Sequence, residues 1–279
     1  MSAVVRDLEQ MLAAYRAKLA RVSDGATAAL AREAKILEDQ ILDLVLKGSG
    51  KLTPKAVAAV RAELRSMSIT SGRRAARQLL RQIEPAMGVA AGRTAETTEY
   101  LLRRIKHPQL NRTLRAMADW ESRIKDRALI RTEYYAARWA QSWDATWSRQ
   151  IDLVGKGLAQ SALRRESWSQ AAERIWPDLE RITEIGGNPI AGRVHPEAFG
   201  RAFARTNLGE MAHEEGVAEA QAVGLRLFAN LGVPDSRQSA ICYLACQQPP
   251  MSIDDWRGWR RDPSDPSNDG GLPKRHVFY

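Results

Sequence analysis

Histidine, cysteine and carboxylate side chains supply most catalytic bases, nucleophiles and metal ligands, so their spacing is the first test for an active site. None of the four histidines lies at a recognised spacing from a serine or cysteine; they are His107, His195, His213 and His276. His213 is followed by Glu214-Glu215, but no second histidine follows at the helical spacing of a zinc protease. No glycine-rich loop follows a predicted strand, which removes the usual nucleotide sites. We expect no enzyme activity and no cofactor.

The two cysteines, Cys242 and Cys246, lie four positions apart and cannot form a disulfide framework. Such sparse cysteine usage fits a reducing compartment. We expect both to be small, buried, apolar side chains of the core, and not a redox pair.

Two sets of arginines recur at helical spacing. The first arginine set is Arg73, Arg77 and Arg81, and the second arginine set is Arg123, Arg127 and Arg131. Residues four apart share one face of a helix, and no acidic residue interrupts either face. Each set is therefore either a solvated surface or a contact for DNA phosphates or an acidic portal surface.

Trp139, Trp143 and Trp147 also recur every four residues. A stripe of this kind fits the core of a helix packed against a neighbour. The functional alternative is base stacking, which needs exposed rings beside a basic groove.

Composition limits the class of protein. The 279 residues carry a net charge of +9, and the pI is near 9.8. This positive charge either attracts a polyanion partner, such as nucleic acid or an acidic protein surface, or belongs to a basic surface that contacts only solvent. Charges begin at Arg6, too early for a signal sequence, and no later stretch suits a membrane span. We expect a soluble protein that is not exported and does not contact membranes.

Apolar periodicity predicts a mainly α fold with extended helical N-terminal and central parts. Residues 4–46 read as two helices or one broken helix, interrupted at Ser23-Asp24-Gly25. Thr53-Pro54 is typical of a helix start. Further along, Pro85, Gly88 and Gly92 argue against one continuous helix up to residue 105.

A boundary is expected at His107-Pro108, followed by a long central helix over residues 109–154. Gly155 and Gly157 should end it, and a further helix is expected over 158–185. Gly186-Gly187-Asn188-Pro189 is typical of a linker. These boundaries predict three regions: 1–107, 108–187 and 188–279.

Beyond the predicted linker, the chain should change from all-helical structure to a mixture of helix and strand. A helix over 196–223 precedes an alternating strand at 225–231. A proline-rich irregular loop follows, with a short helix near 253–259 and a terminal strand at 277–279. The last region is therefore expected to be a small α+β lobe.

The order of residues in this last region resembles a known family. Arg205-Thr206-Asn207 on a helix is followed by Asp235-Ser236-Arg237, then Cys242, and finally Pro273-Lys274-Arg275-His276. This order is similar to the C-terminal domain of phage head-morphogenesis proteins, the minor head proteins of the Mu F type. The similarity covers about residues 155–279 and includes a loose match around Gly157-Leu158.

The resemblance implies a structural lobe in which Arg205, Asp235 and Arg237 hold the fold together, with Thr206, Cys242 and His276 at matching positions. The chain also departs from the family pattern. Ser239 stands in place of the first cysteine of the turn, and Tyr279 stands where a late cysteine falls. Because zinc needs about four such ligands, we expect no metal.

The resemblance further implies a minor capsid protein of a tailed phage. Such a protein would associate with the portal protein and the major capsid protein during head assembly, with double-stranded DNA as a further candidate partner and no small-molecule substrate. It would lie in the virion, inside the head or near the portal, and in the host cytoplasm during assembly. The alternative is a DNA-binding protein that acts in genome packaging or ejection, and an enzyme comes third.

Overall fold

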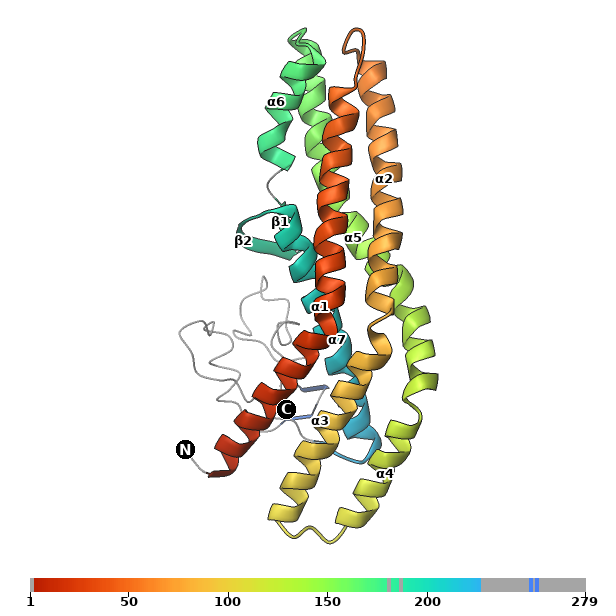
Figure 1. Ribbon diagram of the computed structural model, residues 1–279, viewed down its shortest axis with the longest axis vertical. Coiled ribbons are helices and arrows are strands. Elements are labelled where there is room, and N and C mark those ends of the chain that lie inside the picture. The colour runs from red at the N-terminus through yellow and green to blue at the C-terminus, as the bar shows by residue number, and fades with distance from the viewer. Residues whose placement is uncertain (1–2, 180–181, 186–187, 227–250, 253, 256–279) are drawn as a thin grey trace. The chain divides into compact units, whose positions relative to one another are not determined.

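The chain is described by a computed structural model that places residues 3–179, 182–185, 188–226, 251–252 and 254–255 (Figure 1). The prediction of a mainly helical protein is confirmed. The described residues form seven helices and one two-stranded sheet: α1 (Ala3–Leu46), α2 (Pro54–Leu80), α3 (Ile83–Arg104), α4 (Leu110–Ser122), α5 (Ile124–Leu163), α6 (Trp168–Leu179), β1 (Ile182–Ile185), β2 (Asn188–Val194) and α7 (Pro196–Ala222).

Helix α1 is continuous, so the predicted interruption at Ser23-Asp24-Gly25 is wrong. A glycine inside a helix costs only about 1 kcal/mol relative to alanine. Burial of apolar side chains outweighs that cost here, since Leu30 and Leu37 are fully buried and Ser23 itself is buried.

Helix α2 begins as predicted. The Thr53 hydroxyl accepts a hydrogen bond from the Ala56 amide at 3.2 Å, and Pro54 is the first helical residue. The expected break before residue 105 exists, but it lies at Arg81-Gln82. Gly88 and Gly92 are instead interior residues of α3.

The predicted central helix over 109–154 is broken by a single non-helical residue. Arg123 has φ −100° and ψ 11°, and it separates α4 from α5. Helix α5 then runs past Gly155 and Gly157 to Leu163, so these glycines do not end it. Both are close-packing positions: a Cβ at Gly157 would lie 2.6 Å from Ile175 Cγ2.

The predicted helix over 158–185 is also wrong. The chain forms α6 and then β1. Three of the four residues of β1 are β-branched, which favours a strand. Strand β1 pairs with β2 in antiparallel register, with Ile185 opposite Asn188 and Glu184 opposite Pro189. Asn188 and Pro189 therefore belong to a hairpin strand and not to a linker.

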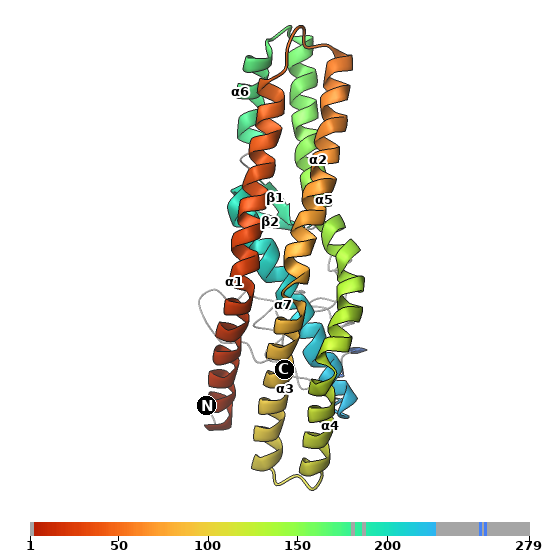
Figure 2. The same cartoon turned by 45° about the vertical axis from the view of Figure 1, so that its right-hand side comes forward.

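Contacts divide the structure into two compact units. Unit 1 comprises residues 1–22, 84–128 and 208–279, and unit 2 comprises residues 23–83 and 129–207. Each unit combines segments that are distant in the sequence. The units therefore do not test the three consecutive regions predicted from the sequence, which remain a prediction. Within unit 2, the segments of α1, α2 and α5 lie side by side in both views (Figure 1 and Figure 2).

The core of unit 2 is aromatic. Trp143 packs against both Phe199 and Phe203 of α7, with ring centroids 5.0 and 5.2 Å away, and its indole N–H donates to the Ser71 hydroxyl at 3.1 Å. Such ring pairs add to the burial of apolar area. These contacts join α2, α5 and α7.

Most of the predicted α+β lobe lies outside the described residues. The strand at 225–231, apart from its first two residues, and the terminal strand at 277–279 both fall there. Within the predicted helix at 253–259, Asp254 and Asp255 are helical, and the Ser252 hydroxyl accepts from the Asp255 amide at 3.1 Å.

Candidate functional site

Two members of the first arginine set lie on α2, and the third is its C-cap residue. Arg73, Arg77 and Arg81 are all exposed. Four residues advance a helix by about 6 Å, so Arg73 and Arg77 are one turn apart on the same side of α2 and Arg81 follows at its end. No aspartate or glutamate occurs between Glu63 and Glu84.

The other arginines of α2 differ from this set because each has an acidic partner. Arg61 and Arg65 reach Asp152 at 2.6 and 3.4 Å, and Arg74 reaches Glu33 at 3.6 Å. Among the described residues, the first arginine set makes no ion pair with an acidic side chain. It is the part of α2 best suited to receive an external anion.

The second arginine set does not form a uniform exposed face. Arg123 is the break residue between α4 and α5, and Arg131 is half-buried. Arg127 is only 16% exposed and lies 2.6 Å from the Glu215 carboxylate. Because the Arg127 guanidinium is paired with Glu215 inside unit 1, the second arginine set does not form a continuous exposed line of cations.

Arg127 belongs to what we call the charge cluster of unit 1. Contacts join three of its members, Trp120, Arg127 and Glu215. The other two are Glu219, which interacts electrostatically with Glu215 and Arg127, and Arg93, which acts electrostatically on Glu219. Arg127 stacks over the Trp120 ring at 4.0 Å, and the Trp120 indole N–H donates to Glu215 at 3.0 Å. Arg127 also donates to the Trp120 carbonyl oxygen. The cluster thus joins α4, α5 and α7.

Glu219 is the unusual member of the charge cluster. It is fully buried, and no hydrogen bond of normal geometry reaches either carboxylate oxygen, since the nearby Thr94 hydroxyl donates to the Ala90 carbonyl oxygen. Burial and then the charge of Glu215 raise the pKa of Glu219 to about 8, although the proximity of the Thr94 hydroxyl and the charges of Arg127 and Arg93 act in the opposite direction. Near neutral pH this side chain is therefore mostly a neutral carboxylic acid.

His213 lies on α7 two residues before Glu215 of the same cluster. Burial, followed by the charge of Arg93, lowers the pKa of His213 to about 3. The imidazole is therefore neutral at physiological pH. Its environment is set by burial and by the charge of Arg93.

Sequence reasoning missed the charge cluster. Glu215 and Glu219 are one turn apart and alternate with buried apolar residues such as Val217 and Ala220. That pattern places both carboxylates on the buried face and was the available signal. Their cationic partner Arg127 is 88 positions away, which no local pattern reveals.

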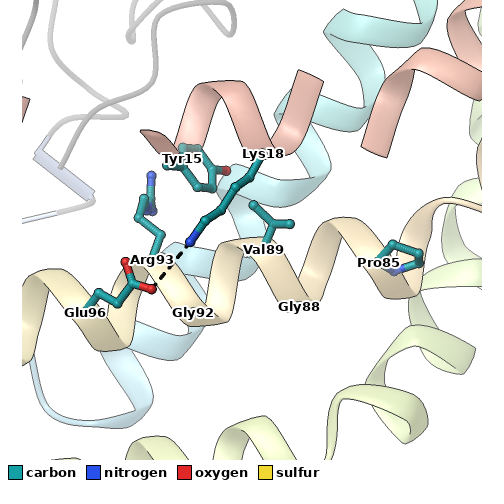
Figure 3. Close-up of a pocket in the computed structure, with 8 residues that line it drawn as sticks. All are labelled: Tyr15, Lys18, Pro85, Gly88, Val89, Gly92, Arg93 and Glu96. Atoms are coloured by element: carbon teal, nitrogen blue, oxygen red, sulfur yellow. Dashed lines mark ion pairs between the residues drawn. The ribbon is translucent and has the colours of Figure 1, made fainter. Parts of the chain in front are cut away.

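Unit 1 also contains a pocket between α1 and α3 of about 270 Å³ (Figure 3). Gly88 and Gly92 form its floor, and a Cβ at either would meet no atom within 4 Å. Arg93 stacks over the Tyr15 ring at 4.5 Å, while Lys18 and Glu96 form an exposed ion pair at 3.5 Å. The polar side chains of the lining are therefore Tyr15, Lys18, Arg93 and Glu96, two of which already form an ion pair.

The tryptophan stripe is core, as the packing interpretation predicted. Trp139, Trp143 and Trp147 are at most 1% exposed. Base stacking requires exposed rings, so that alternative is wrong for these three residues.

The residues of the C-terminal motif are only partly described. Arg205 is exposed and Thr206 is half-buried, and both lie on α7 as expected. Asp235, Arg237, Cys242 and His276 lie outside the described residues. The expected contact of Arg205 with the turn at Asp235 therefore stays a prediction.

In the part of the chain that is placed, no three histidine, cysteine, aspartate or glutamate side chains are grouped to hold a metal ion. In the same ranges, no helix combines the length and apolarity that a membrane span requires.

Comparison with known proteins gives no further assignment. No protein-family model matches the sequence, and no curated protein or solved structure shows significant similarity to it.

Proposed function

We propose that this chain is a structural minor head protein of a tailed phage. In this proposal it associates with the portal protein and the major capsid protein during head assembly. It resides inside the head or near the portal in the virion, and in the host cytoplasm before that.

The observation that carries the proposal is the order of motif residues in the last third of the chain, beginning with Arg205-Thr206 on a helix. Helix α7 supports this, because it contains both residues. The mainly helical fold and the absence of a legible catalytic set among the described residues agree with a structural role. Cohesion of the lobe through Arg205, Asp235 and Arg237 is part of the same proposal.

The alternative is a DNA-binding protein that acts in packaging or ejection. The first arginine set favours it, since three exposed cations without acidic partners can contact successive phosphates. An acidic surface on a protein partner would suit the same cations, so the two functions must be separated by experiment.

The deciding experiment is a pull-down of portal protein from a nuclease-treated lysate of infected cells, with the purified chain as bait. A structural head protein should retain portal or capsid protein after nuclease treatment. Loss of every partner on nuclease treatment would favour the alternative. An Arg205→Gln variant serves as a second bait: it should retain less partner if the C-terminal lobe makes the contact.

A further inference from the structure

One side of α5 exposes apolar side chains in a helical pattern. Ile130 and Tyr134 are 66% and 57% exposed, and Ala137 is exposed as well. Successive spacings of four and three residues place these side chains on one line along the helix. Tyr135 and Trp139, each 1% exposed, lie on the opposite side of α5, which is buried in unit 2. We call Ile130, Tyr134 and Ala137 the apolar seam.

The two flanks of the apolar seam carry opposite charges. Glu133 is on one flank, and Arg131 and Arg138 are on the other, since Glu133 and Arg138 are separated by about 140° around the helix. The two cannot pair within one helix, because residues five apart do not face each other. Glu133 is exposed and has no ion-pair partner in the part of the chain that the structure describes.

Arg138 is held beside the apolar seam by the tyrosines of α5. Its guanidinium donates to the Tyr134 hydroxyl at 3.3 Å and lies 5.6 Å from the centre of the Tyr135 ring. A guanidinium has several N–H donors in one plane and can bind a carboxylate while it keeps another contact. Arg138 is thus placed to receive an acidic side chain from outside the chain.

A second copy of the chain matches this surface when its α5 lies alongside in the same direction. In such a parallel pair the apolar residues face each other, and each flank meets the opposite flank of the other helix. Glu133 of one copy then lies beside Arg138 of the second copy, and the same pair recurs across the two-fold axis. If the helices ran in opposite directions, like flanks would meet, which is unfavourable.

We propose that α5 forms a homodimer through the apolar seam, with Glu133 of each copy paired with Arg138 of the other. Exposed apolar side chains grouped beside charged ones are typical of a protein–protein contact. The apolar seam extends over only about two helical turns, so the dimer should be small in interface and weak. The proposal does not depend on the proposed role in the phage head.

The test is sedimentation equilibrium of the full chain between about 1 μM and about 300 μM. The average mass should rise from the 31.1 kDa of one chain toward twice that value. Ile130→Ser should raise the dissociation constant at least about tenfold, because each dimer loses two apolar contacts. The matched control is Leu129→Ser, at a neighbouring side chain that is 64% exposed but lies about 100° around the helix from Ile130. It should keep the wild-type dissociation constant.

Exchange of charges tests the pairing itself. Glu133→Arg places two arginines beside each other in its own dimer, and Arg138→Glu places two glutamates beside each other, so each variant alone should stay a monomer. An equimolar mixture of the two should dimerise, because every flank contact in the mixed dimer again joins opposite charges. Circular dichroism establishes that both variants are folded, and the comparison of Ile130→Ser with Leu129→Ser decides if Arg138→Glu is not.

Three outcomes would overturn the proposed homodimer. The first is a wild-type chain that keeps the mass of one copy over the whole concentration range. The second is an equal effect of Ile130→Ser and Leu129→Ser. The third is a mixture of folded Glu133→Arg and Arg138→Glu that remains monomeric.

Discussion

Arg127 holds a single oxygen of Glu215 with two nitrogen atoms. Its Nε and Nη2 lie 2.9 and 2.6 Å from Glu215 Oε1, and Glu215 is 1% exposed. A charged pair this far from water stabilises a fold only while both members are present, because either alone is an uncompensated buried charge. The pair therefore fixes the position of α7 against the start of α5 within unit 1.

Arg127→Met should destabilise the protein strongly, because the variant retains the apolar stem but leaves the Glu215 charge buried. The expected loss in free energy of unfolding is about 3–5 kcal/mol, measured by urea denaturation. The control is Arg103→Met, whose partner Glu99 forms an exposed pair on α3. That change should cost less than about 1 kcal/mol, and similar losses in both variants would refute the buried role of Arg127.

His213→Gln should make the protein less sensitive to acid. Because burial and Arg93 lower the pKa of His213 to about 3 from an ordinary value of 6.5, the unfolded chain binds a proton first as pH falls. Stability is therefore present above pH 6.5 and is lost as pH falls toward 3. Urea midpoints taken near pH 7 and near pH 5 should differ less in His213→Gln than in the wild type.

The control for this change is His195→Gln, at an exposed histidine. It should reproduce the wild-type difference between the two pH values. An equal effect of both variants would mean that general protonation, and not His213, sets the acid response.

Alanine at Gly72 and at Gly88 should change stability in opposite directions. A Cβ at Gly72 would lie 2.8 Å from the Ala140 carbonyl oxygen, so helices α2 and α5 must move apart. Overpacking of this kind costs about 1–3 kcal/mol. A Cβ at Gly88 meets nothing within 4 Å. Gly88→Ala should therefore raise the free energy of unfolding by about 1 kcal/mol, the helix propensity of alanine over glycine.

Thermal unfolding of both variants against the wild type checks this pair. The melting temperature should fall for Gly72→Ala and rise for Gly88→Ala. A fall of similar size in both would mean that the pocket above Gly88 has no room for a methyl group.

Replacement of the first arginine set should weaken binding to duplex DNA, if that set contacts phosphates. Each phosphate contact contributes a slope of about −0.9 in log affinity against log salt, so Arg73→Gln, Arg77→Gln and Arg81→Gln together should flatten the slope by about 2.7. Sequence preference should be negligible. Substitution of exposed arginines should change folding stability by less than about half a kcal/mol each.

A matched control removes the same charge elsewhere. Arg16, Arg112 and Arg115 are exposed residues of unit 1 that lie on other helices. Their joint replacement by glutamine should leave the salt slope near the wild-type value. Equal flattening by both triple variants would show that net charge, and not α2, determines binding.

Local patterns predicted the structure where a local cause determined it. Thr53-Pro54 starts a helix because the cap and the proline act within one turn, and the tryptophan stripe is buried because its period matches a helix face. Gly25 and Gly155 misled the prediction, because contacts with distant segments decide whether a glycine ends a helix. The linker predicted at residues 186–189 did not reveal the pairing of β1 with β2, because a local pattern does not show which segments pair.

The candidate site shows the same division. The spacing of Arg73, Arg77 and Arg81 predicted a shared face, and in the structure all three are exposed, with Arg73 and Arg77 on α2 and Arg81 at its C-cap. The same spacing in the second arginine set gave no warning that Arg127 is buried. The environment of Arg127 depends on Glu215, which is 88 positions away in the sequence and becomes its neighbour only in the folded chain.

Gly200 limits which residues can occupy one position of α7. A Cβ there would lie 2.3 Å from the Leu30 carbonyl oxygen and 2.7 Å from the Ala31 nitrogen, both backbone atoms of α1. A core leucine can be replaced by a smaller residue that leaves a cavity, but no amino acid is smaller than glycine. Every missense mutation of this codon must therefore displace a helix backbone, so we expect random mutagenesis to recover folded variants at Leu30 far more readily than at Gly200.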